Sequence, residues 1–252
     1  MEKTKIDWCD SSFNPVTGCY HKCEYCYARK IAERFSGNFE SPAKNVRLKT
    51  RLKAKSKEGK TIVSAYPFGF KPTFHEYRIK DLETKKFGKN IFVCSMADLF
   101  GDWIPDEWIE DIFNELKKYE EHRYLFLTKN PKRYVQLSKK GLLPDNRNFW
   151  YGTTLTKPSQ EFYKLQGYNT FVSVEPILQS FNEISEAISY CFDWLITGAE
   201  TGNRKDKVIP EKEWIDEIAA QFISKGKPVF MKSSLKSVMK DEIKTEFPWR
   251  NE

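Results

Sequence analysis

Six short apolar segments after residue 90 constrain the fold of this chain more than any other feature. They begin 21 to 35 residues apart and are Ile91–Ser95, Tyr124–Thr128, Phe149–Thr154, Thr170–Val174, Asp193–Thr197 and Pro228–Met231. This spacing leaves room for a helix between successive strands, which favours strand–helix–strand units over hairpins. The sequence therefore predicts an α/β fold with parallel strands.

The stretches between these segments have a helical pattern. One helix is predicted after Pro105 and another after Pro210, because apolar residues follow each proline at three- and four-residue steps: Ile109, Ile112, Phe113 and Leu116, then Trp214, Ile215, Ile218 and Phe222. A first strand near Ser12–Val16 and a helix over Ala28–Phe35 precede them. We predict a single domain over residues 1–252, a full or partial (β/α) barrel of about six to seven parallel strands.

Residues 36–88 interrupt this pattern and are predicted to be an insertion after the first strand–helix unit. Within it, Ser41–Lys60 holds one acid, Glu58, and eight basic residues: Lys44, Arg47, Lys49, Arg51, Lys53, Lys55, Lys57 and Lys60. An aromatic and proline-rich run, Tyr66–Pro72, follows. The basic segment is either a solvated surface or a surface for a polyanion, nucleic acid above all. It contains no aromatic residue, which weakens the case for base stacking.

Three of the six cysteines lie close together as Cys19, Cys23 and Cys26, with Tyr25 before the last. Three thiolates on one loop can ligate three irons of a cubane cluster and leave the fourth iron open to a substrate or cosubstrate. Cys94 and Cys191 lie among apolar neighbours and are expected to pack as small hydrophobic residues. Cys9 is ambiguous, because it is close enough in sequence to approach the cysteine loop.

The amino terminus lacks the apolar core of a signal peptide, and no apolar run has the length of a membrane helix. We therefore expect a cytoplasmic protein without membrane contact. In that compartment, clustered cysteines are metal ligands more often than disulfide partners. The net charge of +7 is modest and comes largely from the insertion.

Polar residues follow the ends of the predicted strands, where barrels of this class carry their chemistry. Acidic residues recur just beyond three strand ends, at Asp98, Glu175 and Glu200. Other strands end in Thr128-Lys129, Thr153-Thr154 and Lys232-Ser233-Ser234. Polar residues end many strands in any protein, so this pattern marks a region and not a mechanism.

The cysteine spacing ahead of a predicted barrel resembles the radical S-adenosylmethionine (SAM) superfamily. More narrowly, the chain resembles a phage-associated three-cysteine family of unknown substrate. That resemblance rests on blocks over most of the chain: Asn14–Cys19, Glu24–Ala28, Ser95–Phe100, Leu127–Pro131, Ser173–Pro176 and Gly198–Gly202. It implies a barrel fold and a cofactor but no particular substrate.

The superfamily resemblance implies a [4Fe–4S] cluster on Cys19, Cys23 and Cys26 with SAM chelated at the open iron. An electron from the cluster would cleave SAM and release a 5′-deoxyadenosyl radical, which would abstract hydrogen from an unknown substrate. An electron donor protein is then also implied. The resemblance and strand-end positions assign SAM contacts to Tyr25, Ser95, Asp98, Thr154, Ser173, Glu175 and Gly198. Lys129 and Glu200 are expected to face the substrate, with an ordinary salt bridge as the alternative for each.

Two alternatives remain open at this point. Cys9 or His21 could join the three cysteines in a structural zinc site, although the usual second Cys-x2-Cys unit is absent. Alternatively, the chain is a non-catalytic protein that binds nucleic acid or a partner around a structural cluster. The basic residues from Lys44 to Lys60 motivate this second alternative, and they also make nucleic acid a candidate substrate of the enzyme.

Overall fold

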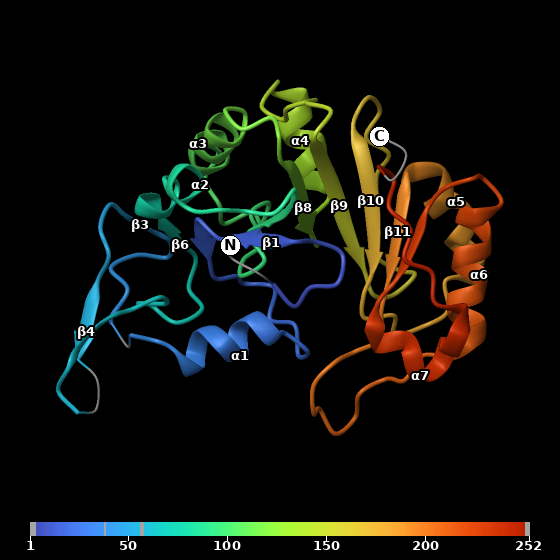
Figure 1. The fold of residues 1–252 in the computed structure, drawn as a ribbon, viewed down its shortest axis with the longest axis horizontal. Helices are drawn as coiled ribbons and strands as arrows, with labels where there is room; N and C mark the ends of the chain where they lie inside the picture. Colours follow the sequence, from blue (N-terminus) through green and yellow to red (C-terminus); the bar gives the residue numbers. More distant parts are fainter. Residues whose placement is uncertain (1–3, 38, 56–57, 250–252) are drawn as a thin grey trace. The chain divides into compact units, whose positions relative to one another are not determined.

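The computed structural model describes residues 4–37, 39–55 and 58–249 (Figure 1). The chain forms two compact units. Of the described residues, unit 1 contains residue 4 and residues 9–124, and unit 2 contains residues 5–8 and 125–249, so one boundary falls within β8 (Arg123–Thr128). The sequence prediction of a single domain stays a prediction.

Unit 1 contains the cysteine loop, the insertion and the first strands of the main sheet. Its elements are β1 (Ser11–Phe13), β2 (Val16–Thr17), α1 (Tyr27–Arg34), β3 (Val46–Leu48), β4 (Lys53–Lys55), β5 (Thr61–Val63), β6 (Thr73–His75), η1 (Glu76–Arg78), α2 (Asp81–Thr84), β7 (Asn90–Val93), α3 (Asp106–Leu116) and the start of β8 (Arg123–Thr128). β1 and β7 pair in parallel.

Unit 2 contains the regular alternation of strands and helices. Its elements after β8 are α4 (Lys132–Lys139), β9 (Phe149–Leu155), β10 (Asn169–Val174), α5 (Asn182–Cys191), β11 (Trp194–Thr197), α6 (Lys212–Ile223), β12 (Val229–Met231), η2 (Ser233–Leu235), α7 (Lys236–Met239) and η3 (Lys240–Glu242). β9 to β12 pair in parallel in sequence order.

The strand order β1-β7-β8-β9-β10-β11-β12 makes a seven-stranded sheet. The α/β class and the predicted number of parallel strands are therefore confirmed. All six apolar segments after residue 90 form strands, with ends within two residues of those predicted. The helices predicted after Pro105 and Pro210 are α3 and α6.

The first strand differs from the prediction. β1 ends at Phe13, and the chain then leaves the main sheet. Val16 and Thr17 form β2, which pairs antiparallel with β6 in a small three-stranded sheet, β2-β6-β3. Pro15 lacks the N–H that a continuous ladder needs, so the pairing of β1 with β7 cannot extend through this residue.

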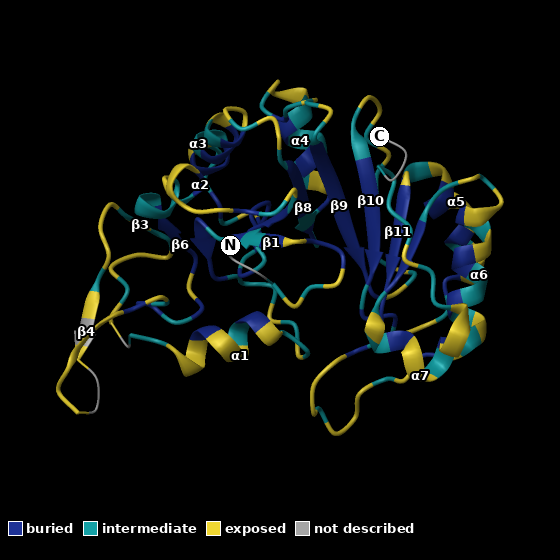
Figure 2. Cartoon of the chain, in the orientation of Figure 1, coloured by how far each residue is buried: buried dark blue, intermediate teal, exposed yellow. Residues whose placement is uncertain are grey.

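In unit 2, successive side chains along each strand point to opposite faces of the sheet. One face carries Leu155, Val174, Leu195 and Met231, which join the helix residues Ile188, Ile215, Ile218 and Phe222 in one buried core. In Figure 2 the buried residues, coloured dark blue, cover the strands and the sides of α5 and α6 that face the strands. Residues of opposite parity, including Thr154 and Ser173, therefore point to the other face of the sheet.

Candidate functional site

The cysteine loop connects β2 to α1 in unit 1. Cys26 is the N-cap of α1, and its sulfur accepts the N–H of Arg29 at 3.3 Å. The Cys19 sulfur accepts the N–H of His21 at 3.4 Å. Both thiols thus receive backbone donors, which are the donors that stabilise sulfur when it carries negative charge.

Gly18 determines where the first cysteine can lie. Its N–H donates to the Met96 carbonyl at 2.9 Å, and its φ of +93° is a conformation that favours glycine. A Cβ on Gly18 would lie 2.3 Å from the Lys71 carbonyl carbon and oxygen. The next residue, Cys19, donates its N–H to the Phe70 carbonyl at 3.2 Å. The loop therefore begins between two backbone segments that hold it from both sides.

The three thiols are close enough to influence one another. Burial, together with the smaller effect of negative charge on Asp98, Cys23 and Cys26, raises the pKa of the Cys19 thiol to about 12. All three cysteines are free thiols of intermediate exposure. Metal binding would remove their protons, since a cation stabilises the thiolate against these effects.

Within the described residues, no three His, Cys, Asp or Glu side chains are arranged around a single metal ion. A four-iron cluster has a different requirement, because each cysteine ligates a different iron. Three free thiols on one loop, with N–H donors on two of them, have the donor chemistry for such a cluster.

His21 lies between the first two cysteines and anchors the loop. Its Nε2 donates to Asp98 Oδ2 at 2.6 Å. Its ring packs edge-on against the Trp103 ring, with 4.9 Å between the ring centres. Asp98 is buried and also accepts the Phe100 N–H at 3.0 Å. The carboxylate that was predicted to contact SAM therefore also fixes the cysteine loop.

Ser95 belongs to a hydrogen-bonded turn after β7. Its hydroxyl donates to Asn14 Oδ1 at 3.1 Å, and the same oxygen accepts the Met96 N–H at 3.0 Å. The Ser95 carbonyl accepts the Tyr27 hydroxyl at 2.9 Å. Tyr25, on the cysteine loop, has intermediate exposure. The structure thus brings Ser95, Asp98 and the cysteine loop together within unit 1.

The remaining predicted residues lie in unit 2. Thr154 and Ser173 are partners across β9 and β10, so their side chains share the face opposite the helices. Both are buried. The Ser173 hydroxyl has no hydrogen-bond partner among the described residues. An unpaired buried hydroxyl costs about 1–3 kcal/mol, so this position favours a ligand that would bond to it.

Glu175 and Lys232 form an ion pair after the ends of β10 and β12. Both side chains are largely buried, with exposures of 22% and 16%. Gly198 follows β11 between them, and a Cβ there would lie 3.1–3.3 Å from both side chains. The glycine therefore leaves the space in which the two side chains meet.

Glu200 and Lys129 were predicted to face substrate. Both carboxylate oxygens of Glu200 accept bonds from the Arg204 guanidinium, at 2.7 and 2.8 Å. This bidentate contact lowers the pKa of the Glu200 carboxyl. Lys129 directly follows β8 and is half-buried. For Glu200 the ordinary salt bridge that we held as the alternative is present.

Three residues of these groups were not assigned as site residues from sequence: Asn14, His21 in its anchoring role, and Lys232. Lys232 did carry a signal, because it directly follows the last strand as Glu175 follows an earlier one. Asn14 and His21 carried none, since their partners Ser95 and Asp98 are more than 75 residues away.

With the geometry described, the chain can be compared with known proteins. It belongs to the family described as "Protein of unknown function (DUF5131)", which matches residues 3–245. No curated protein matches the sequence. The family assignment therefore carries no reaction with it.

Among solved structures, the chain is similar to "Spore photoproduct lyase complexed with dinucleoside spore photoproduct". The identity is 11% and the TM-score is 0.45, over 88% of this chain. The chain spans 63% of the length of that protein. Separately, none of the described helices combines the length and apolarity needed to cross a membrane.

Proposed function

We propose that this chain is a radical SAM enzyme that acts on a substrate not yet identified. One observation carries the proposal. Three free thiols, Cys19, Cys23 and Cys26, lie on a single loop after the first strands of a parallel α/β fold, within electrostatic reach of one another. This donor set suits a cluster with one open iron.

In this proposal the three cysteines hold a [4Fe–4S] cluster. When bound, the cluster supplies the electron that cleaves SAM reductively to methionine and a 5′-deoxyadenosyl radical. The chain's own task is to position the reactants and exclude water. His21, Asp98 and Trp103 hold the loop in place, and Gly18 sets where it begins.

The residues that would contact SAM fall into the two groups described above. In unit 1 they are Tyr25, Ser95 and Asp98. In unit 2, the unpaired Ser173 hydroxyl and its neighbour Thr154 suit the ribose hydroxyls or the carboxylate of SAM.

At the ends of β10 to β12, Glu175 suits a ribose or amino group, and Gly198 allows close approach of an adenine ring. Lys232 adds a cation beside Glu175 that suits a carboxylate. This assignment of Lys232 follows from its ion pair with Glu175 and its position after β12.

Lys129 and Glu200 are the residues that we propose to face the substrate. The ion pair of Glu200 with Arg204 gives this carboxylate a second role, because it joins two residues of the loop after β11. An electron donor protein completes the proposed system.

The proposal is tested by anaerobic reconstitution with iron and sulfide, followed by a SAM cleavage assay with dithionite. Wild-type protein is expected to bind about four irons per chain and to release 5′-deoxyadenosine. Cys23→Ala is expected to lose both. Cys191→Ala is the matched control, because it removes a thiol that packs against the core of unit 2.

Each alternative has its own result in the same experiment. Colourless protein with one zinc per chain would support the structural zinc site. A stable cluster without 5′-deoxyadenosine would favour the non-catalytic binding protein. Equal iron in Cys23→Ala and wild type would overturn the assignment of the three ligands.

A further inference from the structure

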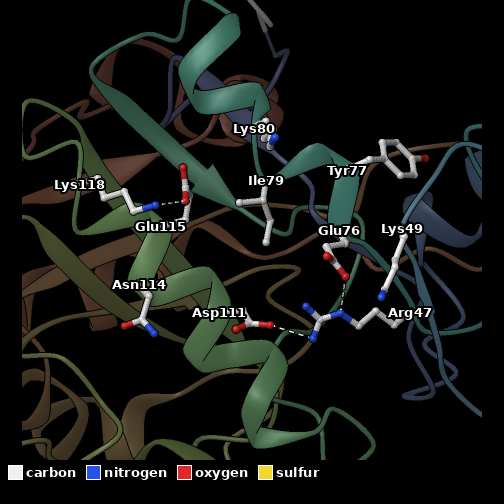
Figure 3. Close-up of a pocket in the computed structure, with 10 residues that line it drawn as sticks. All are labelled: Arg47, Lys49, Glu76, Tyr77, Ile79, Lys80, Asp111, Asn114, Glu115 and Lys118. Atoms are coloured by element: carbon white, nitrogen blue, oxygen red, sulfur yellow. Dashed lines mark hydrogen bonds and ion pairs between the residues drawn. The ribbon is translucent and has the colours of Figure 1, made fainter.

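A surface hollow of about 480 Å³ lies in unit 1, away from the cysteine loop in sequence. Its lining comes from three segments: residues 47–49 at β3, residues 76–80 at and after η1, and residues 111–118 at the end of α3 and just beyond it (Figure 3). The first segment belongs to the basic stretch of the insertion. The charges around the hollow decide what it can bind.

Each acidic residue of the hollow has a cationic partner. Arg47 donates to Glu76 at 2.6 Å and to Asp111 at 2.9 Å, and Figure 3 shows the guanidinium between the two carboxylates. The same guanidinium lies 5.0 Å from the centre of the Phe74 ring. Glu115 pairs with Lys118 at 2.7 Å. Arg47 is thus a structural residue. Because it serves two carboxylates, these ion pairs together carry one net negative charge, which Lys49 and Lys80 outweigh.

The cations that remain are unpaired. Lys49 and Lys80 are exposed, and neither forms an ion pair with any residue in the described part of the chain. Arg51 is also exposed and unpaired, and its guanidinium lies 5.5 Å from the centre of the Tyr77 ring. The ring restricts where this guanidinium can lie, through a cation–π contact. We call Lys49, Arg51 and Lys80 the basic triad.

The basic triad continues into a regular array along the chain. Basic residues occupy every second position from Arg47 to Lys55, but the chain bends at Lys49 and Thr50, so the extended part that follows the basic triad is β4, with Lys53 and Lys55. In an extended strand, alternate side chains share a face and lie about 6.6 Å apart. This spacing equals about two steps of the 3.4 Å charge spacing along one strand of DNA. Lys57, next in the series, lies outside the described residues.

We propose that the basic triad and the following strand β4 bind the phosphate backbone of a nucleic acid without reading its sequence. The triad leaves no exposed ring for stacking, because Arg51 and Arg78 lie over Tyr77 at 5.5 and 5.8 Å. Phosphate contacts alone give orientation and affinity but no sequence preference. The inference deepens the proposed function, since a bound nucleic acid is a candidate substrate. The phosphate contacts of the basic triad do not require the [4Fe–4S] cluster.

The test is fluorescence anisotropy with a labelled 30-nucleotide DNA, its duplex, and an RNA of the same sequence, each at several salt concentrations. Neutralising three phosphate contacts in Lys49→Gln/Arg51→Gln/Lys80→Gln is expected to lower the salt slope by about 2 for single strands and about 2.7 for duplex. If the variant and wild type bind equally at 1 M salt, this corresponds at 0.15 M salt to an affinity loss of about 50- to 170-fold. The three probes show which form of nucleic acid is bound.

The control Lys139→Gln/Lys236→Gln/Lys240→Gln removes the same charge from exposed lysines of unit 2 and is expected to bind like wild type. Cys23→Ala is also expected to bind nucleic acid like wild type. A failure of the proposed cluster can therefore be distinguished from a failure of the proposed nucleic-acid surface. Binding that is equal in the triad variant and wild type would overturn the inference, as would no binding by wild type. Tighter binding to phosphatidylserine vesicles than to every oligonucleotide would replace it with a membrane surface.

Discussion

Replacing Gly18 by alanine tests how the backbone holds the first cysteine. Two costs are expected. A φ of +93° costs an alanine about 1–2 kcal/mol. In addition, the new Cβ would lie 2.3 Å from the Lys71 carbonyl, and relieving such overlap costs about 1–3 kcal/mol. Gly18→Ala is therefore expected to lower the free energy of unfolding by about 2–5 kcal/mol.

Gly167 supplies a matched control. Its φ is +86°, and a Cβ there would meet no heavy atom within 4 Å. Gly167→Ala thus carries the dihedral cost of about 1–2 kcal/mol without the overlap. Urea unfolding of both apo variants against wild type measures the difference, which isolates the contact with Lys71.

The cluster adds a second measurement. Gly18 directly precedes Cys19, so a displaced backbone is expected to move the first thiol and lower the iron content of Gly18→Ala after reconstitution. Gly167→Ala is expected to keep the iron content of wild type. If Gly18→Ala unfolds at the same urea concentration as Gly167→Ala, the argument from the Lys71 contact is wrong.

Two further predictions concern buried charge. Burial lowers the pKa of the His75 imidazole to about 2, so between that value and about pH 6.5 this side chain is protonated only in the unfolded chain. The free energy of unfolding is therefore expected to fall by about 2 kcal/mol from pH 7 to pH 5. Urea unfolding of His75→Asn is expected to show a flatter pH dependence than wild type. Lys232→Met leaves the largely buried Glu175 carboxylate without its partner, which is expected to lower the free energy of unfolding by about 1–3 kcal/mol. The control Lys236→Met, at an exposed position, is expected to change the free energy of unfolding by less than about 0.5 kcal/mol. An unchanged unfolding midpoint for Lys232→Met would show that solvent reaches the pair.

The strands after residue 90 were predictable because one rule governs them. A parallel sheet covered by helices needs apolar strands at helix-length intervals, and the six segments satisfied both conditions. The first strand was less predictable. Pro15 shows that a ladder must break after Phe13, but that Val16 then pairs with β6 depends on contacts distant in sequence.

The candidate site was predictable in position and less so in pairing. The pattern of polar strand ends singled out Ser173 and Glu175, and both lie at the carboxyl end of β10. The pattern did not identify the partner of Glu175, because Lys232 is 57 residues away and meets it only through the register of three strands. Likewise, nothing near His21 in sequence indicates Asp98.

The basic stretch shows how pairing changes the meaning of a charge. Counting residues from Lys44 to Lys60 treats all eight cations alike. Arg47 is in fact bound by Glu76 and Asp111, which lie 29 and 64 positions further along the chain, while Lys49 and Arg51 keep their charge for an outside partner. Net charge therefore overstates the number of cations that are available for binding. A modest net charge is therefore compatible with a localised nucleic-acid surface, because affinity depends on the number of phosphates contacted and not on the charge of the whole chain.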